Sequence, residues 1–579
     1  MKYSNPVINI ISNEIKKTSL KLWDISIEDN LNTLFTTPPK KDLGDICFPC
    51  FILSKLTKEK PNIIADKLSS KLGIVKFVKS TNSQGPYLNI FFNTQNVAES
   101  LIPSILDQSY FKLSPQSDEK IMVEYSQPNT HKDLHVGHMR NLCLGNAIVR
   151  MNRYASNDIT SATYPGDSGT HVAKCLQFLK KYKMNEIPKE NKGQWLSKVY
   201  IESEQKFQSL GEKEKEDLKI ELGTILTEIH DQKGEYYSLW QETREWSINL
   251  MKEVYAWANV DFDQWFFESV EDAPSVEYIN KLYEDGKLQK NDGAIGIDLS
   301  EDKLKFCLLL KSNGTGLYST KDIMLAKTKF ENHDITQNIY IVDDRQSFHF
   351  KQIFKTLEKL KFPYAKNCYH LPYAMVELPS GAMSSRKGKV VLINELIEKM
   401  QESITQNYLS KYKEEWSSDE IKDTAKKIAN AAIKYGMLRV DNNRKIVFDM
   451  DEWLKLDGET GPYLLYVVAR INSIESKIKL LDEKIDFNLL QTDQEKQLLN
   501  HLNSFNETVI SGALKLQTIH VCSYLYNLAK LYNSFYAECS ILKAPSEELK
   551  HTRLALTSAT KIILTKGLST LGIDCIERM

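Results

Sequence analysis

The spacing of apolar residues divides the chain into three stretches. Residues 1–115 begin with a helical repeat from Val7 to Leu22, and the alternating run Gly85–Asn93 fits a half-buried strand. Residues 116–390 alternate strand-like and helix-like runs, which is typical of a parallel sheet with helical connections. Residues 391–579 have helical spacing almost throughout. We therefore predict a multidomain α/β protein with an N-terminal α+β domain, a central parallel-sheet domain and a C-terminal all-α domain.

Two helical regions add detail to this division. Residues from about 185 to 250 are long, charged and helical in pattern, so we predict an insertion into the sheet domain rather than part of the sheet. Near the C-terminus, apolar residues recur on one face of a helix, which predicts a helical bundle. They are Val521, Tyr524, Leu525, Leu528, Leu531, Tyr532 and Phe535.

Composition excludes several classes of protein. The 579 residues are too many for one ordinary core, and 42% hydrophobic with 26% charged residues is normal for a soluble protein. A net charge of −1 gives no sign of a polyanionic partner, although a local basic face fits the same total. Nine scattered cysteines favour a reducing compartment. No apolar run is long enough for a membrane span or a signal peptide, so we expect a cytoplasmic protein with no membrane partner.

The stretch Ile121–Tyr154 carries the clearest chemistry. It reads as a buried strand, a polar loop and a helix that begins near Val136. The first backbone N–H groups of a helix lack intrahelical partners, so we expect a strand–loop–helix entrance to bind an anion. His135 and His138 lie three residues apart and share one face, and Gly137 between them lets a ligand approach the backbone. This arrangement favours a phosphate site.

Two other interpretations of the histidine pair stay open on residues alone. The pair could be purely structural. It could also bind zinc, although no third ligand follows at a familiar spacing, so no metal site is predicted.

Arginine is used unevenly along the chain. The first arginine is Arg140, and every earlier basic residue is lysine or histidine. In a lysine-rich chain, we expect arginine to persist where planar, bidentate contact with phosphate or carboxylate is needed; chance retention is the alternative. The residues concerned are Arg140, Arg150, Arg153, Arg345, Arg386, Arg439, Arg444 and Arg470.

HVGH resembles the HIGH signature of class I aminoacyl-tRNA synthetases. The longer string SQPNTHKDLHVGHMRN resembles the arginyl-tRNA synthetase form, and further similar strings follow in order: YSTKD, DDRQSFH, FDMDEWL, DGETGPYLLY, LYNSFYAECSIL and the terminal GIDCIERM. The resemblance covers nearly the whole chain. It implies a Rossmann-like catalytic domain at 116–390, an additional N-terminal domain at 1–115 that contacts tRNA, and a helical anticodon-binding domain at 391–579.

Five polar residues fall at strand exits or helix entrances: Glu124, Asn129, Tyr318, Asp322 and Gln346. Ligands of open α/β sheets collect there, and a guanidinium group needs carboxylates and planar acceptors. Each residue alone fits a core or capping role equally well. The resemblance implies that together they bind arginine, with Glu124 and Asp322 as anchors for the side chain and Asn129 and Gln346 at the α-amino and carboxyl ends.

MSSRKGK (Met383–Lys389) resembles the KMSKS loop but departs from it. Ala382 and Arg386 stand where the two lysines would be, and Lys387 follows one place later. The resemblance implies that Lys132, ahead of HVGH, compensates for the altered lysine positions of this loop. How the positive charge is shared among Lys132, Arg386 and Lys387 stays open. Without the resemblance, an ordinary surface loop is the better interpretation. The residues implied to bind ATP are His135, Gly137, His138, Met383, Ser384 and Ser385.

Tyr463, Tyr466 and Arg470 share one predicted helix, and Arg439 and Arg444 precede it closely. Aromatic side chains beside arginines suit stacking on splayed RNA bases, so we predict tRNA contacts here. The alternative is that the tyrosines are core residues of a bundle.

The implied function is arginine–tRNA ligase. L-arginine would react with ATP, accompanied by Mg²⁺, to give arginyl-adenylate and pyrophosphate, and the arginyl group would then pass to the terminal adenosine of tRNA(Arg), releasing AMP. Family members usually need bound tRNA for the first step. We expect a monomer with no structural metal. A class I synthetase for another amino acid and a catalytically silent tRNA-binding relative are the alternatives.

Overall fold

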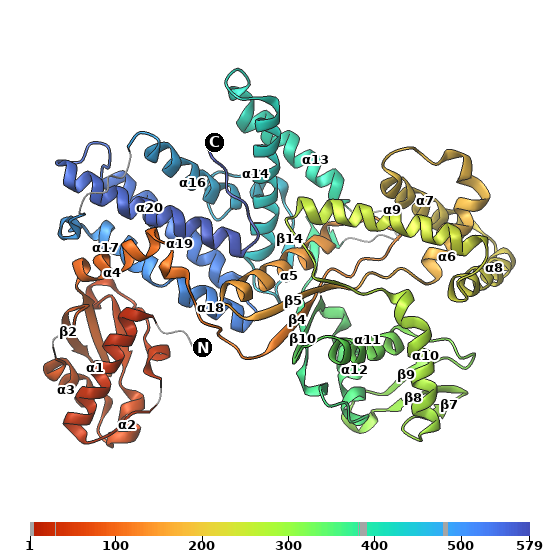
Figure 1. Ribbon diagram of the computed structural model, residues 1–579, viewed down its shortest axis with the longest axis horizontal. Helices are drawn as coiled ribbons and strands as arrows, with labels where there is room; N and C mark the ends of the chain where they lie inside the picture. The colour runs from red at the N-terminus through yellow and green to blue at the C-terminus, as the bar shows by residue number, and fades with distance from the viewer. Residues whose placement is uncertain (1–4, 29, 74, 380, 383–390, 479–484) are drawn as a thin grey trace.

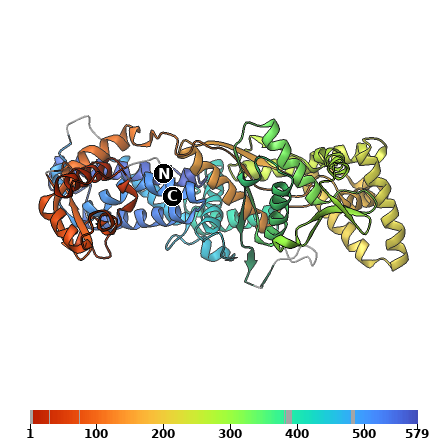
Figure 2. The ribbon, with the colours of Figure 1, turned by 90° about the horizontal axis from the view of Figure 1, so that it is seen from below.

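The computed structural model describes all residues except 1–4, 29, 74, 380, 383–390 and 479–484. The molecule is elongated, with the N-terminal domain and the helical insertion at opposite ends (Figure 1). The parallel sheet and the C-terminal bundle lie between them, and the same order is seen from below in Figure 2. Within the described residues, no helix is long and apolar enough to cross a membrane.

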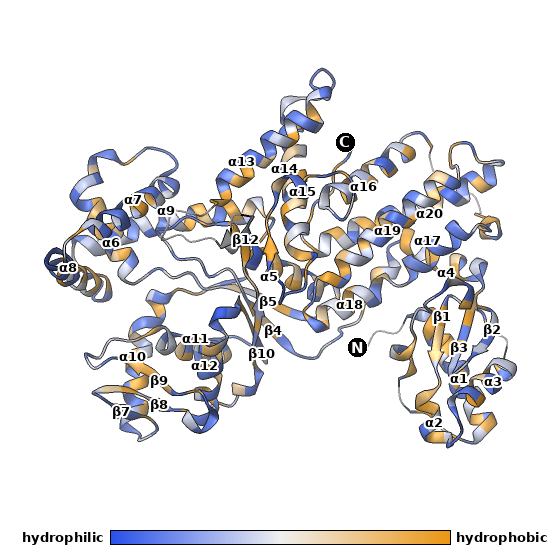
Figure 3. Cartoon of the chain, turned by 180° about the vertical axis from the view of Figure 1, so that it is seen from behind, coloured by the Kyte–Doolittle hydropathy of each residue, from blue (hydrophilic) through white to orange (hydrophobic). Residues whose placement is uncertain are grey.

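The N-terminal domain packs helices on a small antiparallel sheet of strand order β1-β3-β2. The predicted helix and strand are both present, as α1 and β3. Figure 3 shows apolar β1 and β3 beside the polar β2, whose sequence is VKSTNSQ. The elements are α1 (Pro6–Trp23), β1 (Ile46–Pro49), α2 (Phe51–Thr57), α3 (Pro61–Lys71), β2 (Val78–Gln84), β3 (Tyr87–Phe92) and the connecting α4 (Thr94–Leu106).

The central domain is built on a five-stranded sheet of order β11-β10-β4-β5-β6, in which all neighbours are parallel. Helix α5 covers one face, and α10, α11 and α12 cover the other (Figure 1). The strands are β4 (Lys120–Glu124), β5 (Asp158–Thr163), β6 (Gln264–Trp265), β10 (Gln337–Asp343) and β11 (Cys368–Tyr373). The helices are α5 (Val136–Tyr154), α10 (Glu268–Glu284), α11 (Tyr318–Asn332) and α12 (Ser347–Lys359). The predicted parallel sheet is confirmed.

The insertion forms a helical unit with a core of its own, in which Leu176, Leu196, Ile225 and Trp240 are buried together. It contains α6 (Thr170–Phe178), α7 (Lys192–Ser209), α8 (Glu212–His230) and α9 (Glu235–Trp257). A small antiparallel sheet follows α10, with β7 (Gln289–Asn291), β8 (Ala294–Asp298) and β9 (Phe306–Leu310).

The buried carboxylate of Asp167 joins the insertion to the sheet. It accepts hydrogen bonds from Arg244 Nε of α9 at 2.7 Å and from the N–H and hydroxyl of Ser269 at 2.8 and 2.7 Å. Asp167 follows the exit of β5, so one side chain fixes α9 and the start of α10 beside the strand ends.

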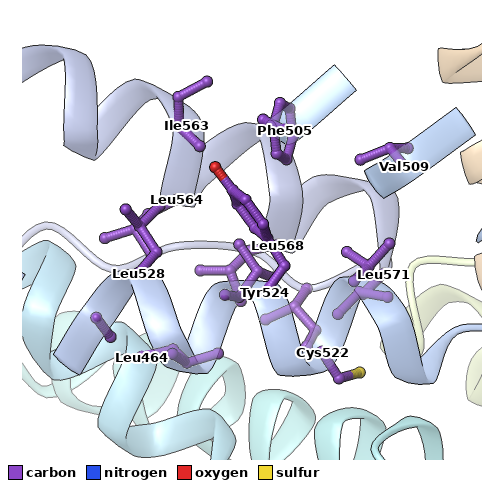
Figure 4. Packing of buried hydrophobic residues seen from close by; sticks show 14 of the residues in the cluster. Leu464, Phe505, Val509, Cys522, Tyr524, Leu528, Ile563, Leu564, Leu568 and Leu571 are labelled. Atoms are coloured by element: carbon purple, nitrogen blue, oxygen red, sulfur yellow. The ribbon is translucent and has the colours of Figure 1, made fainter. Parts of the chain in front are cut away.

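The C-terminal domain is a bundle whose core is the apolar stripe expected on α19. Figure 4 shows Tyr524 and Leu528 of α19 packed against Leu564 and Leu568 of α20. The helices are α13 (Ile393–Ile404), α14 (Ser418–Leu438), α15 (Met450–Trp453), α16 (Gly461–Glu475), α17 (Asp493–Asn503), α18 (Phe505–Lys515), α19 (Ile519–Glu538) and α20 (Glu547–Thr570). A short strand, β14 (Ile446–Val447), leaves the bundle and pairs with β12 (Val376–Leu378), which follows the sheet.

Arg140 of α5 joins the sheet domain to the bundle. Its side chain is 1% exposed, and its guanidinium donates to backbone carbonyls from two segments. These are Ala374 (2.6 Å) after β11, and Asp441 (3.2 Å), Asn442 (3.1 Å) and Arg444 (2.8 Å) after α14. The expectation of a phosphate or carboxylate partner is therefore wrong for Arg140, because its fork of donors satisfies buried carbonyls instead.

Three other arginines from the predicted set bond either to a backbone carbonyl, like Arg140, or to a carboxylate, as expected. Arg150 also donates to a carbonyl, that of Asn259, at 2.9 Å. Arg153 lies 2.6 Å from the carboxylate of Asp263, and Arg345 makes a two-bond contact with Asp343. The expected bidentate contact with a carboxylate is confirmed for Arg345, whereas Arg153 makes a single hydrogen bond.

We predict that Arg140→Lys destabilises the protein although it keeps the charge. An ammonium cannot reach all four carbonyls, and each buried acceptor left without a donor costs about 1–3 kcal/mol, so we expect a loss of about 2–4 kcal/mol in the free energy of unfolding. Arg153→Lys, on the exposed side of the same helix, should cost less than about 1 kcal/mol. Urea unfolding followed by circular dichroism measures both; equal losses would contradict the role given to Arg140.

Candidate active site

The HVGH turn is held by the two histidines themselves. His135 is the N-cap of α5, and its Nδ1 accepts the N–H of Gly137 at 3.1 Å. In return, Nδ1 of His138 accepts the N–H of His135 at 3.1 Å. The two rings stack with centroids 3.9 Å apart. The expected common face of the histidines is confirmed.

The first backbone N–H groups of α5 are already occupied. That of Val136 donates to the carbonyl of Val391 at 3.2 Å, that of Gly137 to His135, and that of His138 to the carbonyl of His135 at 2.8 Å. The expectation of free N–H groups for an anion is therefore wrong at these three residues. The imidazole caps and the neighbouring chain have taken the place that an anion was expected to fill.

The rings offer donors of their own instead. Burial lowers the pKa of His135 to about 4 and that of His138 well below its usual value, so both rings are neutral near pH 7. Because each Nδ1 accepts a hydrogen bond, the single ring proton of each imidazole lies on Nε2. The turn therefore presents two neutral N–H donors rather than two positive charges.

Lys132 precedes the turn and lies on the side of the insertion. Its ammonium is 5.0 Å from the ring centre of Tyr200 in α7. The preceding His131 has a positive φ of 63° and is fully buried, with its ring nitrogens 2.9 Å from the hydroxyls of Thr130 and Thr243. His131 thus fixes the loop against α9, a role that the sequence did not predict.

The second predicted catalytic stretch, with Met383, Ser384, Ser385, Arg386 and Lys387, lies outside the described residues. The chain on both sides of it is described. Before it, β12 pairs with β13 (Gly381–Ala382). After it, the N–H of Ile393 donates to the carbonyl of Leu134 at 3.0 Å, and Leu392 forms a bridge with His135. Leu134, His135 and Val136 are thus bonded to the segment that follows this stretch.

The five predicted arginine-binding residues lie around the carboxyl ends of β4, β5 and β10. Glu124 ends β4, Gln346 follows β10, and Asn129 forms a bridge with Gly166 after β5. Tyr318 and Asp322 occupy the first two turns of α11, and Tyr318 is 65% exposed. A side chain at Gly166 would clash with Asn129 and come within 3.2 Å of Glu268, so a glycine is required for this close packing.

The charges of the two predicted anchors are not equally available. Glu124 is buried in an ion pair with Lys329, which is itself fully buried on α11, and it also accepts from Gln127 at 3.2 Å. Asp322 lies on the more open side, 2.6 Å from Nε2 of His349. The paired Glu124 is thus largely compensated before any ligand arrives.

Glu268, at the start of α10, is a further acidic residue that the sequence did not point to. It is 8% exposed, and its carboxylate is 3.6 Å from Lys321. Burial, with Asp322 and Asp167 nearby, raises the pKa of Glu268 to about 7. Glu268 lies three residues after the end of β6, so its place near a strand exit is the signal that could have found it.

The predicted tRNA-contacting residues fall into two groups. Tyr463, Tyr466 and Arg470 gather on α16: Arg470 donates to Tyr466 at 3.1 Å and to Asn533 of α19 at 2.6 Å. Asn533 in turn donates to the hydroxyl of Tyr463 at 2.8 Å. We call these four residues the α16 patch. Arg439 instead lies 3.8 Å from Glu459, and Arg444 is exposed in the loop before β14.

The sheet, the HVGH turn at its strand exits and the helical bundle together define a class I aminoacyl-tRNA synthetase. Residues 101–450 match the family described as tRNA synthetases class I (R), catalytic domain. Residues 464–579 match the DALR anticodon binding domain, and residues 5–92 match the arginyl tRNA synthetase N terminal domain.

Comparison with individual proteins narrows the class. The chain is 49% identical over 555 residues to an arginine–tRNA ligase of Bdellovibrio bacteriovorus, covering 95% of each chain. It is 33% identical to that of Treponema denticola, covering 98% of each. The solved arginyl-tRNA synthetase of Thermus thermophilus superposes with a TM-score of 0.83 at 25% identity, over 99% of this chain and 100% of that one. The chain belongs to the arginyl-tRNA synthetase family, and the predicted fold class, enzyme class and function are confirmed.

We predict that acid destabilises this protein partly through its buried neutral histidines. Burial lowers the pKa of His131 to about 3, whereas histidine in the unfolded chain titrates near 6.5. Between these values the unfolded chain binds a proton that the folded chain does not, so stability falls as the pH is lowered from 6.5. The contribution of His131 at pH 5 is about 2 kcal/mol.

Asparagine tolerates a positive φ and does not titrate, so His131→Asn should show a shallower loss of stability between pH 7 and 5. Urea unfolding at each pH measures the slope. Parallel slopes for the two proteins would show that His131 is not held neutral.

Proposed function

We propose that the chain activates L-arginine with ATP and transfers it to tRNA(Arg) through the residues of the strand-exit site. The observation that carries the proposal is that the HVGH turn and an acidic cluster of Glu124, Glu268 and Asp322 lie together at the carboxyl ends of neighbouring parallel strands. Ligands of open α/β sheets bind at this edge. The acidic cluster suits the guanidinium of arginine, and the turn suits the phosphates of ATP. The reaction must bring these two molecules together.

In the first step, the arginine carboxylate attacks the α-phosphate of ATP and pyrophosphate leaves. The chain contributes mainly positioning and stabilisation of charge. His135 and His138 donate their Nε2–H groups to phosphate oxygens, and Gly137 leaves room for the nucleotide. Lys132, Arg386 and Lys387 share the charge of the triphosphate, and Met383, Ser384 and Ser385 complete the ATP site. Mg²⁺ enters with ATP and needs no resident site.

The arginine side chain enters between the sheet and the N-terminal ends of α10 and α11. Asp322 is the main anchor for the guanidinium, since the charge of Glu124 is balanced by Lys329. Asn129 and Gln346 bind the α-amino and carboxyl ends, and the exposed ring of Tyr318 forms a wall.

The remaining domains bind tRNA. Residues 1–115 contact the body of tRNA, and residues 116–390 contain the site of the reaction. Residues 391–579 bind the anticodon. Within this last domain, the α16 patch stacks on bases, and Arg439 and Arg444 contact the RNA backbone. We propose a cytoplasmic monomer.

We predict ATP–pyrophosphate exchange with arginine alone among the amino acids, and only when tRNA is present. His138→Asn isolates the imidazole donor, because asparagine keeps an acceptor for the N–H of His135 but has nothing in place of Nε2–H. Exchange should fall about 100-fold or more, with tRNA affinity unchanged.

The exposed His520 of α19 provides a control, and His520→Asn should leave exchange intact. If no amino acid supports exchange although tRNA binds tightly, the chain is a silent tRNA-binding relative and the proposal fails. Exchange with a different amino acid would instead show that the site binds that amino acid and not arginine.

We predict that Arg470→Ala weakens tRNA binding by about 10-fold, because stacking on a base is worth about 1–3 kcal/mol and the arginine also orients Tyr466. Exchange at saturating tRNA should be unchanged. Lys427→Ala removes one positive charge from α14 outside the α16 patch and is the control. Equal losses of affinity in a filter-binding assay would show that only charge matters.

A further inference from the structure

Tyr164 directly follows β5, on the sheet face that carries the acidic cluster of Glu124, Glu268 and Asp322. Side chains alternate between faces along a strand, and Glu124 is in register with Ala162 of β5 and Tyr340 of β10. Tyr164 packs in the same cluster as Ala162 and Tyr340, beneath α10 and α11. It therefore lies on the same face as Glu124, at the strand exit where the proposed arginine site opens.

The hydroxyl of Tyr164 is buried and has no hydrogen-bond partner among the described residues. The residue is only 7% exposed. Buried polar groups are rarely left unpaired, so an orphan hydroxyl at a binding site calls for a ligand or a bound water.

The surroundings of this hydroxyl are acidic. Burial raises the pKa of Tyr164 well above its usual value, and the carboxylates of Asp322, Glu268 and Glu124 lie close enough to raise it further. The phenol is therefore neutral. Its oxygen keeps a free acceptor position for the N–H of a cation that binds beside these carboxylates.

A guanidinium group fits this arrangement better than the alternatives. It has five N–H donors and no acceptor, so it can bind carboxylates and a phenol oxygen at the same time. The neutral ureido group of citrulline has nearly the same shape but turns a carbonyl oxygen toward carboxylates. The ammonium of lysine is a compact group that lacks the planar fork.

We propose that Tyr164 is a specificity-determining residue whose hydroxyl accepts a hydrogen bond from the guanidinium of substrate arginine. The inference rests on the proposed function of the pocket. The same hydroxyl holds the planar group flat against the sheet face, while Asp322 supplies the charge.

Tyr164→Phe removes the hydroxyl and keeps the ring. A hydrogen bond to a charged group is worth about 10-fold to 100-fold in binding, so kcat/KM for arginine should fall by that factor in tRNA-dependent exchange. The KM for ATP and the Kd for tRNA should not change. The neutral N–H groups of citrulline make a weaker hydrogen bond to the same oxygen, so exchange with citrulline should fall less and the ratio of kcat/KM for arginine to that for citrulline should narrow.

Tyr125 provides a matched control. It is fully buried at the exit of the adjacent strand, and its hydroxyl also has no hydrogen-bond partner in the part of the chain that the structure describes, but it packs on the opposite face against Phe262. Tyr125→Phe should leave all these constants unchanged, and thermal unfolding of both variants checks that they fold alike.

Two failures can be told apart. If the unsubstituted protein shows no exchange with arginine, the proposed function is wrong. If it does, and Tyr164→Phe behaves like Tyr125→Phe, the hydroxyl binds only water and the inference about Tyr164 is overturned.

Discussion

The buried guanidinium of Arg140 ties helix α5, which begins with the HVGH turn, to the segments that join the sheet to the bundle. Burying a guanidinium is costly unless its donors are used, and Arg140 meets this condition with carbonyls of Ala374, Asp441, Asn442 and Arg444. These carbonyls belong to the strand exit before β12 and to the loop before β14. Helix α5, which begins with the HVGH turn, is therefore fixed to both. Arg140 thus adds a hydrogen-bonded joint to the apolar packing of α5 against α14, α18 and α20 and to the pairing of β12 with β14.

The fold was predictable from sequence as far as periodicity determines it. Apolar faces are buried by helix α1, by the stripe on α19 and by the alternating strands and helices of the central domain. Buried positions of this kind recur at regular spacing along the sequence. The pairing of β12 with β14 left no such trace, because each has only a few residues. The partners of Arg140 could not be predicted either, since every residue carries a carbonyl and no side-chain pattern marks the ones that are used.

The site was predictable in position but not in electrostatics. Strand exits, together with the family resemblance, pointed to Glu124, Asn129, Tyr318, Asp322 and Gln346, and the structure places these around neighbouring strand ends. The pairing of Glu124 with Lys329 joins residues far apart in sequence, so no local pattern revealed it. The neutral state of His135 and His138 and the raised pKa of Glu268 come from burial, which is known only once the chain is folded.

The stacked, mutually capping histidines have a consequence for how the turn responds to its medium. A positive charge attracts an anion over a distance that dissolved ions shorten, so its contribution weakens as ionic strength rises. A neutral N–H donor acts by its dipole and only at contact. In the proposed mechanism, the contact between this turn and a phosphate is therefore short-ranged and resistant to salt, and the long-range attraction of the nucleotide falls to cationic side chains such as Lys132.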